Sequence, residues 1–236
     1  SFGNLFITAL SKVTGDFEKA IAESSKVLAI RGRVIPSTLE KVSLLGEFED
    51  GSVLEGETNI TDAQKKLKNL RLKPENCRAC PEALAAIENA DLIILGPGSL
   101  YTSVLPNLLI QDIFEAILKS DAYKLHVLNV MTQPGETDEM SAWQHLKVLL
   151  EHTDPRIVDA CVVNTQEIPE RMISKYAEKG AAVVDIEEDL LQEKGYELIR
   201  GPILRLDGQV RHDSELLARM IFEHYFNRVG KMAQKA

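Results

Sequence analysis

Two hydrophobic periodicities alternate along most of the chain. Short apolar runs predict buried strands, and apolar positions spaced three or four residues apart predict amphipathic helices. The predicted strands cover residues 91–95, 125–130, 158–164 and 181–186. The predicted helices cover residues 15–30, 81–90, 107–119, 140–151, 169–179 and 214–228. This alternation indicates βαβ crossovers and a mostly parallel sheet with helices on both faces.

Two Asp-Gly pairs interrupt this pattern and predict β-hairpins. Asp50-Gly51 separates two stretches rich in β-formers, 42–48 and 52–59, which we expect to form a small antiparallel attachment. Asp207-Gly208 lies in the stretch 204–210 and predicts a second hairpin before the last helix. The polar, basic stretch 61–74 is expected on the surface. No repeat or linker is visible, so we expect residues 1–236 to form a single domain.

Composition limits the kinds of partner. The chain has 236 residues, of which 44% are hydrophobic, and a formal net charge of −9. The acidic balance argues against non-specific binding to nucleic acid or to anionic membranes. It leaves open a single phosphate group held by local backbone amides. No apolar run reaches the ~18 residues of a membrane helix, and the three cysteines suggest reduced thiols and a cytoplasmic location. The chain begins without a methionine, so we expect it to be a piece of a longer protein.

Candidate chemistry is concentrated in the loops after the predicted strands, where open α/β sheets bind their ligands. The first loop contains Gly96, Pro97, Gly98, Ser99 and Thr102. Its glycines allow a close backbone approach, and its hydroxyls and the following helix could present donors to an anion. A tight turn with capping serines explains the same residues. The loop lacks the Gly-Lys-Ser/Thr of a Walker A motif.

The second and third loops are rich in amide and hydroxyl groups. Asn129, Thr132 and Gln133 follow the strand 125–130, and they could hold a sugar or base, or simply precede a helix cap at Thr137 or Asp138. Asn164 ends the strand 158–164, where a cap before Pro169 is the simpler reading. Three polar loops at one end of one sheet favour a shared ligand site.

Other candidate groups give weaker signals. Cys77 and Cys80 have C-x-x-C spacing, but no second cysteine pair or nearby histidine completes a zinc site, so we expect no metal. Arg211 could clamp a phosphate or form an ion pair, and Asp213 is the expected cap of the last helix. Tyr176 lies in a predicted helix, where it could be part of the core.

Several sequence motifs resemble the CofD-like superfamily, and most closely its bacterial branch, the gluconeogenesis factors. They occur in the same order as in that family, and they extend from Ser1 to about Phe226. The family implies a Rossmann-like three-layer α/β/α fold. Its members normally begin with a glycine-rich GGGTG loop after a first strand and a DDGGSSG-like segment, and neither is present here. The motifs are SFGNLF, TGDFEKAI, LAIRGRVIPST, LGPGSLYTSVLPNLL, NVMTQPGET, VVNTQEIPE and RHDS.

The resemblance implies a ligand and a role. The bacterial branch is taken to bind UDP-sugars such as UDP-N-acetylglucosamine and to influence central carbon metabolism, cell shape and cell-wall synthesis without established catalysis. By the same resemblance we expect a homodimer and protein partners in cell-wall regulation. Carried over to this chain, the implied ligand contacts are the Gly96–Ser99 loop, Thr102, Asn129, Thr132, Gln133, Asn164, Tyr176 and Arg211, together with Asn4 in the SFGNL motif.

Two other functions are alternatives to this one. The second branch of the superfamily, 2-phospho-L-lactate transferase, uses a guanosine diphosphate donor, and such chemistry would need Mg²⁺ held by carboxylates. The three loops offer only Glu136, Asp138, Glu139 and Glu167, with no paired-aspartate motif, so the visible residues favour binding over catalysis. An NAD-binding oxidoreductase is the third alternative, but no G-x-G-x-x-G motif is present.

Overall fold

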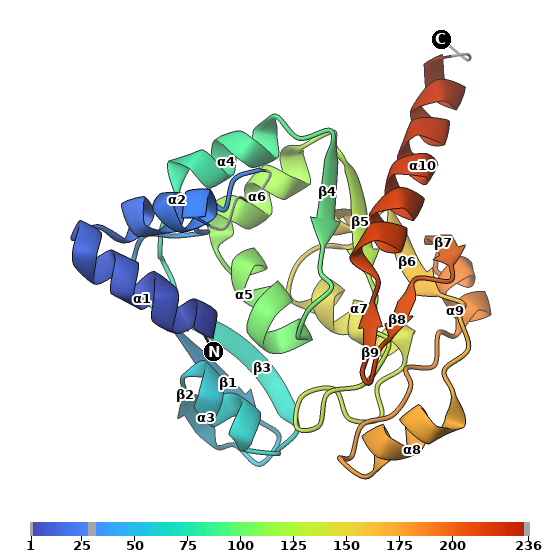
Figure 1. The fold of residues 1–236 in the computed structure, drawn as a ribbon. Helices are drawn as coiled ribbons and strands as arrows, with labels where there is room; N and C mark the ends of the chain where they lie inside the picture. The colour runs from blue at the N-terminus through green and yellow to red at the C-terminus, as the bar shows by residue number, and fades with distance from the viewer. Residues whose placement is uncertain (1, 28–31, 234–236) are drawn as a thin grey trace.

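A computed structural model describes residues 2–27 and 32–233 of the chain. Its centre is a four-stranded parallel sheet in the order β4-β5-β6-β7 (Figure 1). The predicted parallel sheet is therefore confirmed. The segment 91–95 forms an edge strand, on which Ile94 keeps 43% of its surface exposed. The strands are β4 (Leu92–Leu95), β5 (Tyr123–Val127), β6 (Ala160–Asn164) and β7 (Glu197–Gly201).

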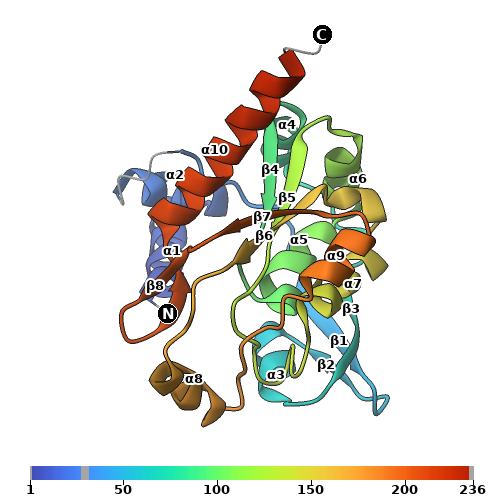
Figure 2. The ribbon, with the colours of Figure 1, turned by 90° about the vertical axis from the view of Figure 1, so that its right-hand side faces the viewer.

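Helices cover both faces of this sheet and give it three layers (Figure 2). One face carries Leu125 and Val162, which pack under Leu217 and Ile221 of α10 (Ser214–Ala233). The other face packs against five helices in one continuous core. The Rossmann-like α/β/α fold class is thus confirmed. The five helices are α4 (Pro81–Glu88), α5 (Leu105–Leu108), α6 (Gln111–Lys119), α7 (Ala142–Glu151) and α9 (Glu188–Glu193).

The small attachment is a three-stranded antiparallel sheet rather than a hairpin. The Asp50-Gly51 turn joins β1 (Ser43–Phe48) to β2 (Val53–Glu55), as predicted, but the second arm ends early because α3 (Glu57–Asp62) begins two residues later. The stretch 61–74 was wrongly expected on the surface. It contains β3 (Leu67–Lys73), which pairs with β1 and buries its leucines in the core that Leu95 shares.

Two further expectations were wrong in detail. Residues 181–186 form no strand, because their backbone bonds to the loop after β5: the Thr132 amide donates to the Ala182 carbonyl at 2.8 Å. β7 takes the sheet position instead. The helix expected over 107–119 is broken at residues 109–110, between α5 and α6, and a π-helical turn, Leu100–Val104, precedes α5.

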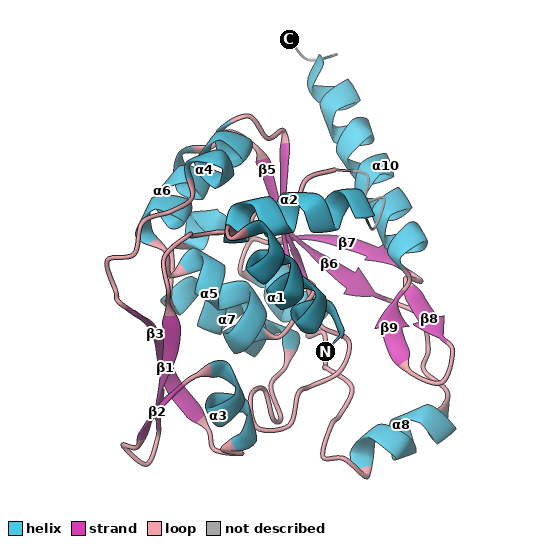
Figure 3. Cartoon of the chain, turned by 60° about the vertical axis from the view of Figure 1, so that its left-hand side comes forward, coloured by secondary structure: helices cyan, strands magenta, loops and turns pink. Residues whose placement is uncertain are grey.

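The remaining elements lie around these two sheets (Figure 3). The second Asp-Gly pair turns between β8 and β9, which confirms the predicted hairpin. Within residues 2–27 and 32–233, no helix combines the length and apolar character needed to cross a membrane. The remaining elements are α1 (Phe2–Thr14), α2 (Phe17–Val27), α8 (Glu170–Ala177), β8 (Leu204–Leu206) and β9 (Val210–His212).

Candidate functional site

The three polar loops lie at one edge of the parallel sheet. Each follows the carboxyl end of a strand, and β4, β5 and β6 are neighbours that run in the same direction. The amide Nδ2 of Asn129 donates to the carbonyl of Gly98 at 2.8 Å, and this hydrogen bond joins the first loop to the second. The arrangement matches the place where open α/β sheets bind ligands.

The first loop needs glycine at its first position. Gly96 has φ +81°, and an added Cβ would lie 3.2 Å from the carbonyl oxygen of Val127. Both the left-handed backbone and this close contact therefore disfavour any residue with a Cβ at this position. Pro97 is exposed, while Gly98 and Ser99 are partly exposed, so the loop lies at the surface rather than inside the core.

A cavity of about 240 Å³ opens at this edge between the second and third loops. Asn129 and Asn164 both line it, together with Glu167 and a largely apolar wall that includes Ile173 and Val184. A few polar groups in an apolar cavity are typical of small-molecule sites, although this volume is below the range of about 300–1,000 Å³ common for drug-sized ligands. The cavity is therefore large enough for only part of a drug-sized molecule.

Asn164 also holds the third loop in place. Its Oδ1 accepts hydrogen bonds from the amides of Gln166 at 3.1 Å and Ile203 at 3.3 Å. Its Nδ2 donates to the Gln166 carbonyl at 2.8 Å. These bonds hold the loop after β6, but they do not form the predicted helix cap, because α8 begins at Glu170 after Pro169 without a side-chain cap. A contact of Asn164 with a ligand would have to be made in addition.

The hydroxyl groups of the first loop contact a carboxylate. Glu136 is only 4% exposed, and its oxygens accept hydrogen bonds from Ser99 Oγ and from Thr102 Oγ1, the latter at 3.2 Å. Thr61 Oγ1 in α3 lies 3.3 Å from the same carboxylate. Sequence reasoning missed this cluster because Thr61 is 75 residues from Glu136 along the chain. The only local signal was an acidic residue directly after a Pro-Gly turn.

The other predicted residues of the second loop have different surroundings. Thr132 is buried, and its Oγ1 accepts from the Ala182 amide at 2.8 Å. It lines a separate cavity of about 410 Å³ beside Trp143. The Gln133 amide donates to Thr137 Oγ1 at 2.8 Å, which closes the turn. The helix that follows is capped by Ser141 rather than by Thr137 or Asp138.

Tyr176 and Arg211 do not line the 240 Å³ cavity. The hydroxyl of Tyr176 accepts from the Val210 amide at 3.0 Å and thereby fastens α8 to the β8–β9 hairpin. Arg211 is exposed on β9, opposite Arg205. Asn4 lies in α1, and its side chain is outside the described residues. Asp213 caps α10 as expected, because its carboxylate accepts from the amides of Glu215 and Leu216.

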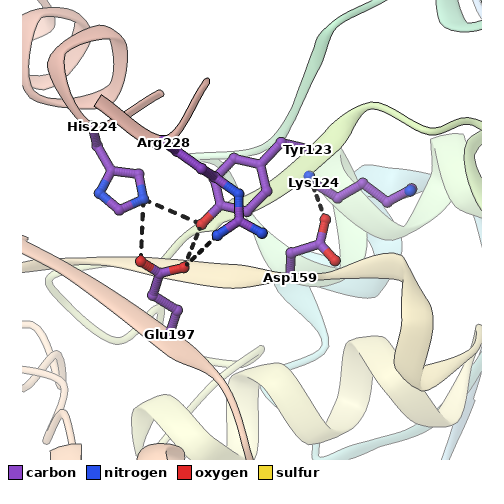
Figure 4. A network of polar contacts seen from close by, with 6 residues as sticks. All are labelled: Tyr123, Lys124, Asp159, Glu197, His224 and Arg228. Atoms are coloured by element: carbon purple, nitrogen blue, oxygen red, sulfur yellow. Dashed lines mark hydrogen bonds and ion pairs between the residues drawn. The ribbon is translucent and has the colours of Figure 1, made fainter. Parts of the chain in front are cut away.

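The amino edge of the same sheet carries a charged cluster (Figure 4). The Tyr123 hydroxyl donates to Glu197 at 2.9 Å, and Arg228 and His224 of α10 contact the same carboxylate at 3.1 and 3.3 Å. Burial and the neighbouring Glu197 raise the pKa of Tyr123. A cavity of about 990 Å³ lies beside this cluster and is larger than the one at the carboxyl edge. We favour the carboxyl edge as the ligand site because the amino-edge groups already bind one another.

Buried thiols and histidines add no metal site. Cys77, Cys80 and Cys161 are free and buried. Within residues 2–27 and 32–233, no three histidine, cysteine or acidic side chains are arranged to hold a metal ion. His126 lies under the carboxyl edge, where burial lowers its pKa to about 4 and its Nδ1 is 3.1 Å from the Leu95 carbonyl.

Comparisons with known proteins agree with these motifs. Residues 1–204 match the family described as 2-phospho-L-lactate transferase CofD. A putative gluconeogenesis factor of Clostridium acetobutylicum is 42% identical over 94% of this chain, and the chain spans about half (51%) of that relative's length. A putative gluconeogenesis factor of Aquifex aeolicus is 44% identical, and the match covers 94% of this chain and 69% of the relative.

A relative and a solved structure extend the same result. The gluconeogenesis factor of Bacillus subtilis is 42% identical, with coverage of 94% of this chain and 71% of the relative. The crystal structure of a Bacillus halodurans protein superposes with a TM-score of 0.87 at 41% identity. That superposition covers 94% of this chain and 72% of the other. Sequence and fold therefore point to the same relatives.

Proposed function

Because the chain belongs to the CofD family, we propose that it is a regulatory protein that binds a nucleotide sugar such as UDP-N-acetylglucosamine. The relatives named gluconeogenesis factors support a role in central carbon metabolism. The proposal extends to an influence on cell shape and cell-wall synthesis from the cytoplasm. A homodimer and protein partners in cell-wall regulation stay predictions.

The observation that carries the proposal is the meeting of two asparagines at one cavity. Asn129 follows β5 and Asn164 ends the neighbouring strand β6, and both line the same cavity of about 240 Å³. Asn129 also donates a hydrogen bond to Gly98 in the glycine-containing loop. Neutral amides suit a sugar or a base, and the glycine loop supplies backbone close to that space for a diphosphate. The formal net charge of −9 argues against a nucleic acid as the ligand.

The transferase alternative rests on the description of the matching family. It requires Mg²⁺, and the carboxylates of the three loops are the candidate ligands. Glu136 is buried among hydroxyl groups, whereas Glu167 lines the cavity and is open to it. Only one of these two carboxylates is therefore placed to share a metal ion with a bound diphosphate.

Calorimetric titration tests the proposal. UDP-N-acetylglucosamine, GDP and NAD are titrated into the protein, each with and without Mg²⁺. We expect the UDP-sugar to bind without Mg²⁺, whereas tighter binding of GDP that depends on Mg²⁺ would favour the transferase and binding of NAD alone would favour the oxidoreductase. No binding of any of the three would refute the assignment.

Two asparagine variants locate the site. Asn129→Ala removes the hydrogen bond to Gly98 and is expected to weaken the UDP-sugar about tenfold. Asn59→Ala is the matched control, since Asn59 also donates a side-chain hydrogen bond to a backbone carbonyl, that of Glu55 at 2.7 Å, but lies in α3 away from the cavity. Equal losses in the two variants would place the ligand elsewhere.

A further inference from the structure

The carboxylate of Glu136 is buried among neutral donors. Its three hydrogen-bond partners are the hydroxyls of Ser99, Thr102 and Thr61, and none of them carries a positive charge. A buried carboxylate is costly unless its oxygens are well hydrogen-bonded. Within residues 2–27 and 32–233, these hydroxyls are the only hydrogen-bond partners of the Glu136 side chain, so the folded state favours hydroxyl orientations that face the carboxylate.

The hydroxyl hydrogens of the first loop are used inside this cluster. A serine hydroxyl has one hydrogen to donate and can also accept. Ser99 Oγ accepts from the Thr102 amide at 3.2 Å, and it lies within hydrogen-bond distance of both the Glu136 carboxylate and Thr102 Oγ1, the latter at 2.6 Å. Its single hydrogen is donated to one of these two groups, so Ser99 has none left for a ligand. An anion at this loop would be bound by backbone amides instead.

The turn that carries Glu136 is more deeply buried than the loop that it contacts, since Gly135 and Glu136 are buried whereas Gly98 and Ser99 are partly exposed. An added Cβ on Gly135 would lie 3.1 Å from the Thr61 carbonyl oxygen and 3.3 Å from the Cα of Gln64, so this turn packs directly against the end of α3. The Gly135 amide also donates to Asp138 at 2.7 Å. Glu136 thus extends from an anchored turn toward the first loop.

From this asymmetry we propose that Glu136 is a positioning residue of the ligand site. It sets the conformation of the turn from Ser99 to Thr102, and through that turn the placement of the backbone amides that bind a diphosphate. The proposal rests on the proposed nucleotide binding and deepens it. It also makes the buried charge part of the site, although the carboxylate itself does not touch the ligand.

The sign of the effect separates positioning from simple electrostatics. Glu136→Gln keeps the shape of the side chain but removes one negative charge near an anionic ligand. Electrostatics alone would therefore strengthen the binding of UDP-N-acetylglucosamine. If Glu136 positions the loop, the variant binds about tenfold more weakly, because the amide forces at least one hydroxyl to turn. Glu139→Gln is the matched control, since Glu139 is exposed on the same loop.

A double-mutant cycle tests whether Glu136 acts through the loop. Ser99→Ala and Glu136→Gln are made singly and together, and both the dissociation constant and the thermal unfolding midpoint are measured. Positioning predicts that the double variant binds no more weakly than Glu136→Gln alone. Additive losses of affinity, or a lowered midpoint with unchanged affinity, would show that Glu136 supports only the fold and would overturn the proposal.

Two further outcomes are distinguishable. If the unaltered protein binds neither UDP-N-acetylglucosamine nor GDP, the proposed function fails and this inference fails with it. If the unaltered protein binds and Glu136→Gln binds equally or more tightly, only the role of Glu136 is wrong. Should Glu136→Gln not fold, Thr61→Val takes its place, because it removes one hydroxyl from the side remote from the loop. Weaker binding by that variant is expected, and unchanged affinity contradicts the proposal.

Discussion

The two edges of the parallel sheet are built from different chemistry. At the carboxyl edge, an amide and hydroxyls join the first loop to the second, and the buried carboxylate of Glu136 has three neutral partners among the described residues. At the amino edge, Glu197 contacts Arg228 and His224 of α10, and the Arg228 guanidinium lies 4.3 Å from the Tyr123 ring centre. One edge keeps a cavity between loops, while the other fastens a helix.

This contrast is the reason why we propose the smaller of the two cavities as the ligand site. The amino edge has the larger space, about 990 Å³, but its charged groups already contact one another. A ligand there would have to break those contacts. At the carboxyl edge the neutral groups hold the loops and leave a partly apolar cavity beside them. The comparison predicts that changes at the carboxyl edge alter ligand affinity and that changes at the amino edge alter only stability.

The largest expected difference between the two edges is the effect of their histidines on the free energy of unfolding at acidic pH. Burial lowers the pKa of His126 from 6.5 to about 4, so the folded protein resists its protonation while the unfolded chain does not. Above pH 6.5 the residue is neutral in both states and has no effect. Between pH 6.5 and 4 it should lower the free energy of unfolding by about 3 kcal/mol. Burial also lowers the pKa of His145, which adds a loss of the same sign.

Chemical denaturation at a series of pH values measures this effect. His126→Asn removes the titrating ring and keeps a donor for the Leu95 carbonyl, so its stability should fall less steeply below pH 6.5. His224→Gln at the amino edge is the control, because the side chain of His224 is 24% exposed beside Glu197. A His126→Asn profile parallel to that of the unaltered protein would show that His126 is not the source of the acid sensitivity.

Substitutions at the two edges should also differ strongly in their effect on ligand affinity. Gly98→Val adds a branched side chain where even a Cβ would lie 3.3 Å from the Cβ of Ser103, and it should displace the loop. We expect about a 100-fold loss in UDP-N-acetylglucosamine affinity, equivalent to about 2.7 kcal/mol, with the fold largely intact. Gly230→Val on α10 is the control, since an added Cβ there meets nothing within 4 Å. Unchanged calorimetric affinity in Gly98→Val would remove the loop from the site.

Sequence patterns predicted the elements that have a strong period. β4 and β6 are apolar runs, and the Asp-Gly turns are local signals, so these were found. β5 was found only from its second half, because it begins with Tyr123 and Lys124, before the predicted start at residue 125. β7 was missed because ELIRG shows little apolar pattern, whereas the apolar stretch 181–186 resembled a strand but bonds to a loop. β3 was missed because its leucines are interleaved with basic residues that face solvent.

The site was predictable only in part for a related reason. Position after a parallel strand follows from local sequence, so the shared edge of the three loops could be inferred. Contacts between distant segments could not. Thr61 with Glu136 joins residues 75 positions apart, and the hydrogen bond from Asn129 to Gly98 joins residues 31 apart. Neither pairing leaves a periodic signal in one sequence.

A comparison of two glycines with nearly the same φ value measures the effect of the close contact at the carboxyl edge. Gly96 and Gly51 have φ values of +81° and +80°, but an added Cβ lies 3.2 Å from the Val127 carbonyl only at Gly96, and at Gly51 it meets nothing within 4 Å. Gly51→Ala should cost about 1 kcal/mol from backbone strain alone, and Gly96→Ala about 2 kcal/mol. Urea denaturation measures both. Equal losses would mean that the strand–loop junction relaxes freely around the added methyl group.

The smallest expected effect lies at the amino edge. Tyr123→Phe removes the hydroxyl that donates to Glu197 at 2.9 Å, while Arg228 and His224 keep their contacts with that carboxylate. Because the charge stays paired, we expect a loss of only about 1 kcal/mol in the free energy of unfolding. The affinity for UDP-N-acetylglucosamine should not change.

Tyr225→Phe is the matched control for this variant. Tyr225 packs against the same core from α10, and its hydroxyl makes no hydrogen bond within the described part of the chain. It should therefore unfold like the unaltered protein. A change in ligand affinity in Tyr123→Phe would contradict the division between the two edges, because a hydroxyl bonded only within the charged cluster would then influence loops at the opposite end of β5.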